Sequence, residues 1–333
     1  MPAFRFPSLV QRFVAALALL LFVAGCTTAP PDSVLAVPAP PQKYAAIVID
    51  ASTGKQLFEV NSTAQRYPAS LTKMMTLYLL FEALDSGRVT KETQIPVSDN
   101  AARQPPTKLR FKRGETIDVD SAIRAIVVKS ANDVAVAIAE YLGGSEEAFA
   151  GAMTAKARQI GMTSTVFRNA SGLPDDDQHT SARDMAVLGM ALRARFPQQF
   201  HYFSESDFMF RGRLVRGHND MLGRVRGVDG IKTGYIRASG FNIVTSYNAD
   251  GRKLIVVVMG ADSARQRNDH VEALIQRSLS PAMADTKTRL MFAGDQPAAS
   301  PLPGLPPPGS SLPGLTPPGL PPPGSQLPGL PTQ

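Results

Sequence analysis

Residues 67–76 read YPASLTKMMT, and the apolar run that continues from them predicts a long helix over 71–84. Residues three apart share one helix face, so the Ser70 hydroxyl and the Lys73 amine can touch. A hydroxyl is a weak nucleophile until a base takes its proton, and a lysine whose ammonium form is destabilised can be that base. This stretch therefore indicates an acylating serine that works without a histidine.

Strand-like apolar runs lie on either side of a helical middle region. Two of them, 44–50 and 56–60, precede the first helix and are joined by a turn. The helices expected after it cover 120–128, 132–142, 145–160, a stretch from Thr180 towards Arg195, and 265–279. The late strands are expected at Phe208–Val215, Gly230–Tyr235, Phe241–Tyr247 and Lys253–Met259. This order predicts an α+β fold whose mainly antiparallel sheet has flanking helices and a helical cluster, and it argues against a repeating βαβ design.

Both ends of the chain differ in composition from the middle. A positive N-terminal region precedes an apolar run, Phe13–Val23, that is too short for a transmembrane span and is typical of a secretory signal. Residues 1–25 are therefore expected to be a signal peptide. Residues 281–333 are expected to be a linker and a disordered Pro/Gly-rich tail, because so much proline cannot supply ladder donors or helix interiors. The segment 43–280 between them is long enough for one catalytic domain.

Cys26 is the only cysteine, which excludes a disulfide within one chain. It ends the tetrapeptide VAGC, residues 23–26, which resembles the bacterial lipobox, a signal whose cysteine is lipidated and becomes the mature N-terminus. The resemblance implies a lipoprotein held through Cys26 at the periplasmic side of a membrane in a bacterial cell envelope. The Pro/Ala-rich residues 26–42 would then form a tether of about 50 Å. The alternative is an ordinary signal peptide with a chance cysteine.

The formal net charge of +7 points to anionic partners. In a cytosolic protein nucleic acid would be one of them. An exported basic protein more naturally meets anionic lipid heads or cell-wall polymer, so no nucleic-acid partner is expected.

Two further short motifs follow Ser70 in order along the chain. Ser130-Ala131-Asn132 lies between two expected helices, where a short loop can be held rigidly and aimed at a cleft. Lys232-Thr233-Gly234 occurs once, on an expected strand whose edge can pair with an extended peptide. Its lysine and threonine can hold a carboxylate by charge and hydroxyl, while Gly234 leaves room for close approach. The order of the three motifs is more specific than any one of them.

Other matches to these patterns are rejected by their position. A second Ser-x-x-Lys lies in the expected hairpin turn, one Ser-x-Asn lies in a polar connection, and another follows Lys232. These matches are Ser52 to Lys55, Ser98 to Asn100 and Ser246 to Asn248. The four histidines show no metal-ligand spacing, and no phosphate-binding glycine loop appears, so neither a metal nor a cofactor is expected. They are His179, His201, His218 and His270.

Ser-x-x-Lys, Ser-x-Asn and Lys-Thr-Gly together are the motif set of penicillin-binding proteins and β-lactamases, although Ala131 stands here where that set has aspartate. The stretches that carry a wider resemblance are 67–76, 128–133, 169–174 (NASGLP) and 228–234 (VDGIKTG). They resemble the serine-type D-alanyl-D-alanine carboxypeptidases, which are low-molecular-mass penicillin-binding proteins. The resemblance covers about 43–280 and implies a β-lactamase/DD-peptidase-like fold. It departs at the C-terminus, where many members carry a second β-rich domain and an amphipathic anchor helix.

The resemblance implies that Ser70 attacks the D-Ala-D-Ala carbonyl of a peptidoglycan stem peptide and forms an acyl-enzyme that water then hydrolyses. Lys73 would take the serine proton, since the positive helix end and a nearby cation disfavour its ammonium form. Ser130 would relay a proton to the leaving D-Ala nitrogen. Asn132 would orient Lys73 and the substrate amide. β-Lactams are expected to acylate Ser70 and so to inhibit the enzyme.

The rest of the implied site binds the substrate. Lys232 and Thr233 would hold its terminal carboxylate, with Gly234 beside them. Backbone N–H groups, that of Ser70 and one near Tyr235, would hold the oxyanion. Such an enzyme would act in cell-wall biogenesis and in maintaining cell shape.

Three alternatives stay open at this point. A DD-endopeptidase that cuts peptidoglycan cross-links would use the same residues. A class A β-lactamase would need an added glutamate for fast deacylation, and no Glu-x-x-Leu-Asn occurs in the middle region. A non-enzymatic envelope lipoprotein could bind wall peptide without cutting it, but the retention of all the reactive groups argues against this.

Overall fold

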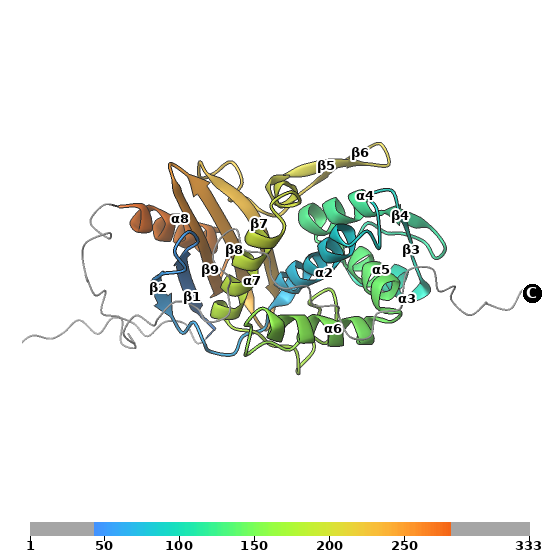
Figure 1. Ribbon diagram of the computed structural model, residues 1–333, viewed down its shortest axis with the longest axis horizontal. Coiled ribbons are helices and arrows are strands. Elements are labelled where there is room, and N and C mark those ends of the chain that lie inside the picture. The colour runs from blue at the N-terminus through green and yellow to red at the C-terminus, as the bar shows by residue number, and fades with distance from the viewer. Residues whose placement is uncertain (1–42, 281–333) are drawn as a thin grey trace, which may run out of the picture. The chain divides into compact units, whose positions relative to one another are not determined.

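The computed structural model describes residues 43–280, which form a five-stranded antiparallel sheet with helices on both of its faces (Figure 1). The strand order is β2-β1-β9-β8-β7, so the first and the last strands of the chain meet in the middle of one sheet. Its strands are β1 (Ala45–Asp50), β2 (Gln56–Val60), β7 (Val228–Ile236), β8 (Gly240–Ala249) and β9 (Arg252–Ala261). The predicted α+β class with a mainly antiparallel sheet is confirmed.

The helical part of the chain lies between β2 and β7. Its α-helices are α2 (Lys73–Asp85), α3 (Asp99–Arg103), α4 (Val119–Arg124), α5 (Asn132–Gly143), α6 (Glu146–Gln159) and α7 (Ala182–Arg195). Shorter turns are η1 (Ala69–Thr72), η2 (Ala125–Lys129) and η3 (Phe200–Ser204), and α8 (Ala264–Leu279) follows the last strand. Two small hairpins complete the fold, β3 (Gln94–Pro96) with β4 (Thr116–Asp118), and β5 (Asp207–Phe210) with β6 (Arg213–Arg216).

Both faces of the sheet are buried because successive residues of each strand point to opposite sides. Along β1, Ile47 and Ile49 join the large core that includes α2 and α5. Ala46 and Val48 join a second core with Val271 and other residues of α8. The helix α7 packs on β1 and β9 from the first side and α8 packs on β8 and β9 from the second (Figure 1).

Serine side chains fix where several helices begin. Ser145, Ser181 and Ser263 precede α6, α7 and α8, and each hydroxyl accepts a hydrogen bond from the backbone N–H three residues on. Such capping satisfies one of the free donors at a helix start. The helix α2 has no such cap, because the 3₁₀ turn η1 leads directly into it.

Some sequence expectations need correction. The single strand expected at Phe208–Val215 is two short strands outside the main sheet, because Arg211 and Gly212 turn the chain with φ of +48° and +71°. The helix expected over 120–128 ends at Arg124 and continues as a π-helical turn. The polar connection before it holds β3, α3 and β4, which no periodicity in the sequence indicated.

Several expectations fall on parts of the chain outside the described residues. These are the signal peptide at 1–25, the lipidated Cys26 with the tether 26–42, and the tail within 281–333. Within 43–280, no helix combines the length and the apolarity that crossing a bilayer requires.

Candidate active site

Ser70 lies in η1, directly before α2, and lines a cleft of about 530 Å³. The turn is held in an unusual conformation, since Ala69 has a φ of +50°. The loop 169–173 lies directly on this turn. A Cβ added to Gly172 would come within 1.8 Å of the Ala69 carbonyl oxygen, so only glycine allows this contact.

Lys73 is the first residue of α2, and its side chain is fully buried. Its Nζ donates hydrogen bonds to Asn132 Oδ1 at 2.7 Å and to the carbonyl oxygen of Ser171, and it lies 3.3 Å from Ser70 Oγ. The first two partners can only accept. A neutral amine has two N–H groups and one lone pair, so this geometry leaves the lone pair for the Ser70 hydroxyl proton.

The environment of Lys73 favours that neutral form. Burial, aided by the positive charge of Lys232, lowers the pKa of Lys73 well below its ordinary value. The carboxylates of Asp133 and Glu146 act in the opposite direction and raise it. Burial is the largest of these effects, so the balance favours the neutral amine, which is the form that can accept a proton.

Ser130 and Asn132 come to Lys73 from the junction of η2 and α5. Ser130 has a left-handed φ of +58°, and its buried Oγ has no hydrogen-bond partner among residues 43–280. Asn132 Nδ2 donates to the Pro105 carbonyl at 2.9 Å, which fixes Oδ1 towards Lys73. Thr107 closes the junction, because its hydroxyl donates to the Ser130 carbonyl and its own carbonyl accepts from Asn132 N–H.

The third motif lies on β7, the edge strand of the sheet next to the cleft. A Cβ added to Gly234 would stand 3.0 Å from Ser70 N, so the strand backbone lies against the start of η1. Lys232 is buried and its Nζ donates to the Thr233 carbonyl at 2.9 Å. Burial and the charge of Arg267 lower the pKa of Lys232 to about 7.

The seven residues expected to carry the chemistry thus come together around one cleft: Ser70, Lys73, Ser130, Asn132, Lys232, Thr233 and Gly234. Cys26, the expected lipidation site, lies outside the described residues. The rejected patterns lie elsewhere. Ser52 is in the β1–β2 turn, Ser98 caps α3, and Ser246 bonds Arg193.

Two residues of the site were not predicted from sequence. Arg267 of α8 lines the cleft at 3% exposure, and its guanidinium donates to Asn268 Oδ1 and to the Asn242 carbonyl without a carboxylate partner among residues 43–280. Burial lowers the pKa of Arg267 to about 10. Ser171 lies in the NASGLP stretch, but it acts through its backbone carbonyl, which no side-chain motif can reveal.

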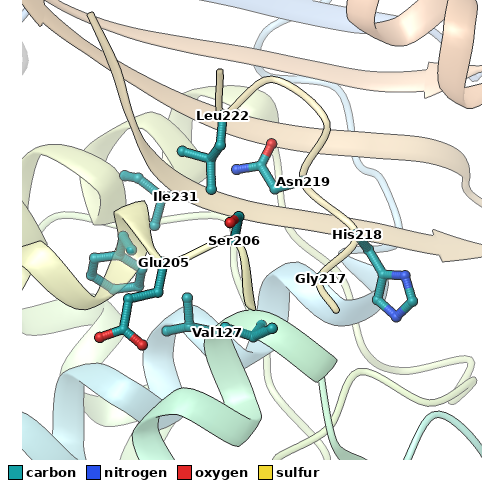
Figure 2. Close-up of a pocket in the computed structure, with 10 residues that line it drawn as sticks. Val127, Glu205, Ser206, Gly217, His218, Asn219, Leu222 and Ile231 are labelled. Atoms are coloured by element: carbon teal, nitrogen blue, oxygen red, sulfur yellow. The ribbon is translucent and has the colours of Figure 1, made fainter. Parts of the chain in front are cut away.

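A smaller cavity adjoins the cleft and is lined in part by η2 and by the segment 217–222 (Figure 2). The amide of Asn219 points into it, whereas His218 points away from it (Figure 2). His218 lines the main cleft, and burial together with Lys232 and Lys129 lowers the pKa of its imidazole. Within the described part of the chain, no three His, Cys, Asp or Glu side chains gather as a metal site would require.

Comparison with known proteins identifies the same family over most of the chain. A sequence profile of the family described as D-alanyl-D-alanine carboxypeptidase, peptidase S11, matches residues 36–263. D-alanyl-D-alanine carboxypeptidase DacD of Escherichia coli (strain K12) is 36% identical over 248 residues, which are 72% of this chain and 64% of that relative. This chain therefore spans less than two thirds of the length of that curated relative.

Solved structures show the same fold. The crystal structure of D-alanyl-D-alanine carboxypeptidase DacD from Francisella tularensis matches with a TM-score of 0.69 at 29% identity, over 73% of this chain and 71% of that one. Penicillin-Binding Protein D2 from Listeria monocytogenes, in its cefotaxime-bound form, matches with a TM-score of 0.65 at 27% identity, over 71% of this chain and 96% of that one. Sequence and fold agree, and the chain belongs to the D-alanyl-D-alanine carboxypeptidase family, peptidase S11.

Proposed function

We propose that this protein is a penicillin-sensitive serine D-Ala-D-Ala carboxypeptidase that removes the terminal D-Ala from peptidoglycan stem peptides through a Ser70 acyl-enzyme. One observation carries the proposal. The buried Lys73 amine donates to two acceptors, which leaves the nitrogen lone pair for the Ser70 hydroxyl, whose Oγ lies 3.3 Å away. Membership of the family supports the same reaction.

Acylation begins when Lys73 Nζ takes the Ser70 proton and Oγ bonds to the carbonyl carbon of the penultimate D-Ala. The carbonyl electrons move onto oxygen, which the N–H of Ser70 and that of Tyr235 stabilise in this proposal. The C–N bond then breaks. The Ser130 hydroxyl gives its proton to the leaving nitrogen and regains one from the Lys73 ammonium. Water hydrolyses the ester, and the shortened peptide leaves with a new carboxylate.

Three side chains are suited to holding the substrate's terminal carboxylate. Lys232 and Arg267 supply positive charge in a buried setting, and Thr233 supplies a hydroxyl. Burial strengthens such contacts, because no water competes for the carboxylate. The bound carboxylate in turn favours the ammonium form of Lys232, whose pKa is about 7 without it.

The test uses a stem pentapeptide, a cross-linked stem-peptide dimer and a labelled penicillin. Mass analysis should show D-Ala released from the pentapeptide, and the penicillin should form a long-lived adduct on Ser70. The Ser70→Ala variant should lose both. Undiminished labelling of that variant would exclude Ser70 as the nucleophile. Cutting of the dimer alone would mean a DD-endopeptidase, and rapid turnover of penicillin would mean a β-lactamase.

We also propose that the chain is processed after residue 25, lipidated at Cys26, and held on the periplasmic side of an envelope membrane by the tether 26–42. The catalytic domain would be 43–280 and the tail 281–333. The support is the VAGC tetrapeptide before the sole cysteine. A fatty-acid label should enter the wild type and not the Cys26→Ser variant. Equal labelling of both proteins would exclude this anchor.

A further inference from the structure

Two segments far apart in the sequence form a basic surface beside the cleft, which we call the basic rim. It consists of the loop 105–115 and the hairpin 207–216. The loop carries four basic side chains and one acidic, and the hairpin carries three and one. These segments therefore have a net charge of +5, compared with +7 for the whole chain.

Arg211 joins the two halves of the basic rim. Its guanidinium lies over the rings of Phe111 and Phe210, at 4.6 and 5.2 Å from their centroids, and pairs with Glu115 at 3.3 Å. The two rings are themselves 5.6 Å apart. Cation–π contacts and ring packing thus hold the hairpin against the loop, and only this one charge is used in doing so.

The buried side chain of Asp133 fixes the backbone path of the loop 105–115. Its carboxylate is fully buried and accepts the backbone N–H groups of Leu109, Arg110 and Phe111 at 3.1, 2.8 and 3.4 Å. Arg110 is held in this way with a φ of +67°, which its own sequence does not favour. Because Asp133 directly follows Asn132, the basic rim is tied to the motif that contacts Lys73.

Four of the other cations of the basic rim are free to bind a ligand, whereas Arg113 pairs with Asp99 at 3.2 Å and Lys108 donates to the Ala102 carbonyl. Arg110, Lys112, Arg213 and Arg216 are exposed, and within residues 43–280 none of them takes part in an ion pair. Two of them are close in sequence to residues that line the cleft. Arg110 follows the cleft residue Thr107 by three positions, and Arg216 directly precedes Gly217, which also lines the cleft.

We propose that the basic rim binds the carboxylates of neighbouring stem peptides on the peptidoglycan polymer, so that the enzyme acts on polymeric wall in preference to a free stem peptide. This inference rests on the proposed function. A glycan strand repeats its stem peptides, and each stem peptide carries free carboxylates outside the bond that is cut. Several weak exposed charge pairs on one polymer add up, because each further contact is intramolecular.

A lipid surface is the competing anionic partner, since Met209 and Leu214 are a cross-strand pair with 63% and 52% exposure. Two such side chains are smaller than one acyl chain, which by itself gives only marginal membrane binding. Two of the unpaired charges, those of Arg110 and Arg216, are in contrast close in sequence to cleft-lining residues. The distribution of charge therefore favours the wall polymer.

The test compares two full-length variants that lose the same charge. The rim variant is Arg110→Gln with Arg213→Gln and Arg216→Gln. The control variant changes three exposed cations that do not line the cleft, Lys55→Gln, Lys253→Gln and Arg195→Gln. For each protein, kcat/KM is measured on a free stem pentapeptide and on purified insoluble peptidoglycan, at low and at raised NaCl.

For the rim variant we expect about a tenfold loss on peptidoglycan, which three exposed charge pairs can supply, and an unchanged rate on the pentapeptide. Salt should reduce wild-type action on the polymer and leave the pentapeptide rate unchanged. The control variant should match the wild type. Equal rates of all three proteins on the polymer would overturn the inference.

Two further outcomes are separable from that one. Sedimentation with vesicles of anionic phospholipid is measured for the same proteins. If the rim variant loses vesicle binding but keeps its action on peptidoglycan, the partner of the basic rim is the lipid bilayer and not the wall polymer. Absence of pentapeptide cleavage and of penicillin labelling in the wild type would instead refute the proposed function itself.

Discussion

At the scale of single residues, the chemistry depends on how burial changes the protonation of two lysines. Lys73 and Lys232 are both buried beside one cleft, and burial lowers the pKa of each. The charge of Lys232 lowers the pKa of Lys73 further, and the charge of Arg267 does the same to Lys232. In the proposed mechanism the consequences differ, because Lys73 must be neutral to accept the Ser70 proton, whereas Lys232 must be charged to hold a carboxylate. The two lysines therefore set opposite limits on the working pH.

We predict a bell-shaped pH dependence of kcat/KM on a stem pentapeptide. Activity rises with pH as Lys73 loses its proton, at a pKa well below the ordinary lysine value. It falls again as Lys232, with a pKa of about 7, loses its charge, and this fall should appear as a rise in KM. Lys232→Arg should move the alkaline limit upward, because arginine keeps its charge, and should leave the acid limb in place. An unchanged alkaline limb would contradict the role given to Lys232.

Arg267 provides a second prediction at this scale. Arg267→Gln removes a buried cation from the carboxylate end of the cleft, and we expect kcat/KM to fall about 10- to 100-fold, mostly through KM. Arg265→Gln is the matched control, since Arg265 lies two positions away and is exposed. Thermal unfolding of both variants separates a binding defect from a folding defect. Equal kinetics of the two variants would show that Arg267 does not hold the substrate.

The sequence revealed those site residues that act through side chains within short motifs. Ser70 and Lys73 are found by spacing, because a helix start places them on one face. Arg267 has no motif around it, and it reaches the cleft only because α8 packs on the sheet beside β8. Ser171 contributes a backbone carbonyl, so its role depends on how the loop 169–173 lies on η1.

At the scale of elements, the site is built where backbones approach each other more closely than a Cβ allows. The loop 169–173 and the strand β7 both press on η1, and glycine occupies each point of contact, at Gly172 and Gly234. These contacts fix the turn that carries Ser70. Ser70 is thereby positioned by two elements, the loop and β7, that are distant from it in sequence.

A matched pair of glycine variants tests this account. Gly172→Ala and Gly212→Ala both place an alanine at a positive φ, of +82° and +71°, and each should cost about 1–2 kcal/mol from the backbone alone. Only the first also meets another backbone, the Ala69 carbonyl. We therefore expect penicillin acylation to fall about 100-fold in Gly172→Ala and to stay unchanged in Gly212→Ala. Similar acylation rates in the two variants would mean that the loop does not position Ser70.

Most elements could be predicted from local pattern, and the exceptions have a physical cause. The strands of the main sheet and the helices α5 to α8 follow runs whose periodicity is long and clear. The short strands β3 to β6 have three or four residues each, too few for a pattern to show. Likewise, the π-helical turn η2 and the left-handed Ser130 are imposed by packing around the cleft rather than by local propensity.

At the scale of the whole molecule, one sheet unites the two ends of the described chain. The strand β1 lies between β2 and β9, so residues near 45 pair with residues near 259. Both hydrophobic cores are built from residues within 43–280, and α8 covers the outer face of the sheet. The same helix brings Arg267 to the cleft, so α8 contributes both to the second hydrophobic core and to the site.

This arrangement predicts that the fragment 43–280 is an independent catalytic unit. We expect its Tm to lie within about 2 °C of the full chain and its penicillin acylation rate to be unchanged, because the fragment keeps both cores of the described residues. A fragment 51–280 is the control, since it lacks β1 and so leaves β2 and β9 without their shared partner. That control should fail to unfold cooperatively and should not bind penicillin. A fragment 43–280 as unstable as the control would show that the segments beyond it are part of the folded unit.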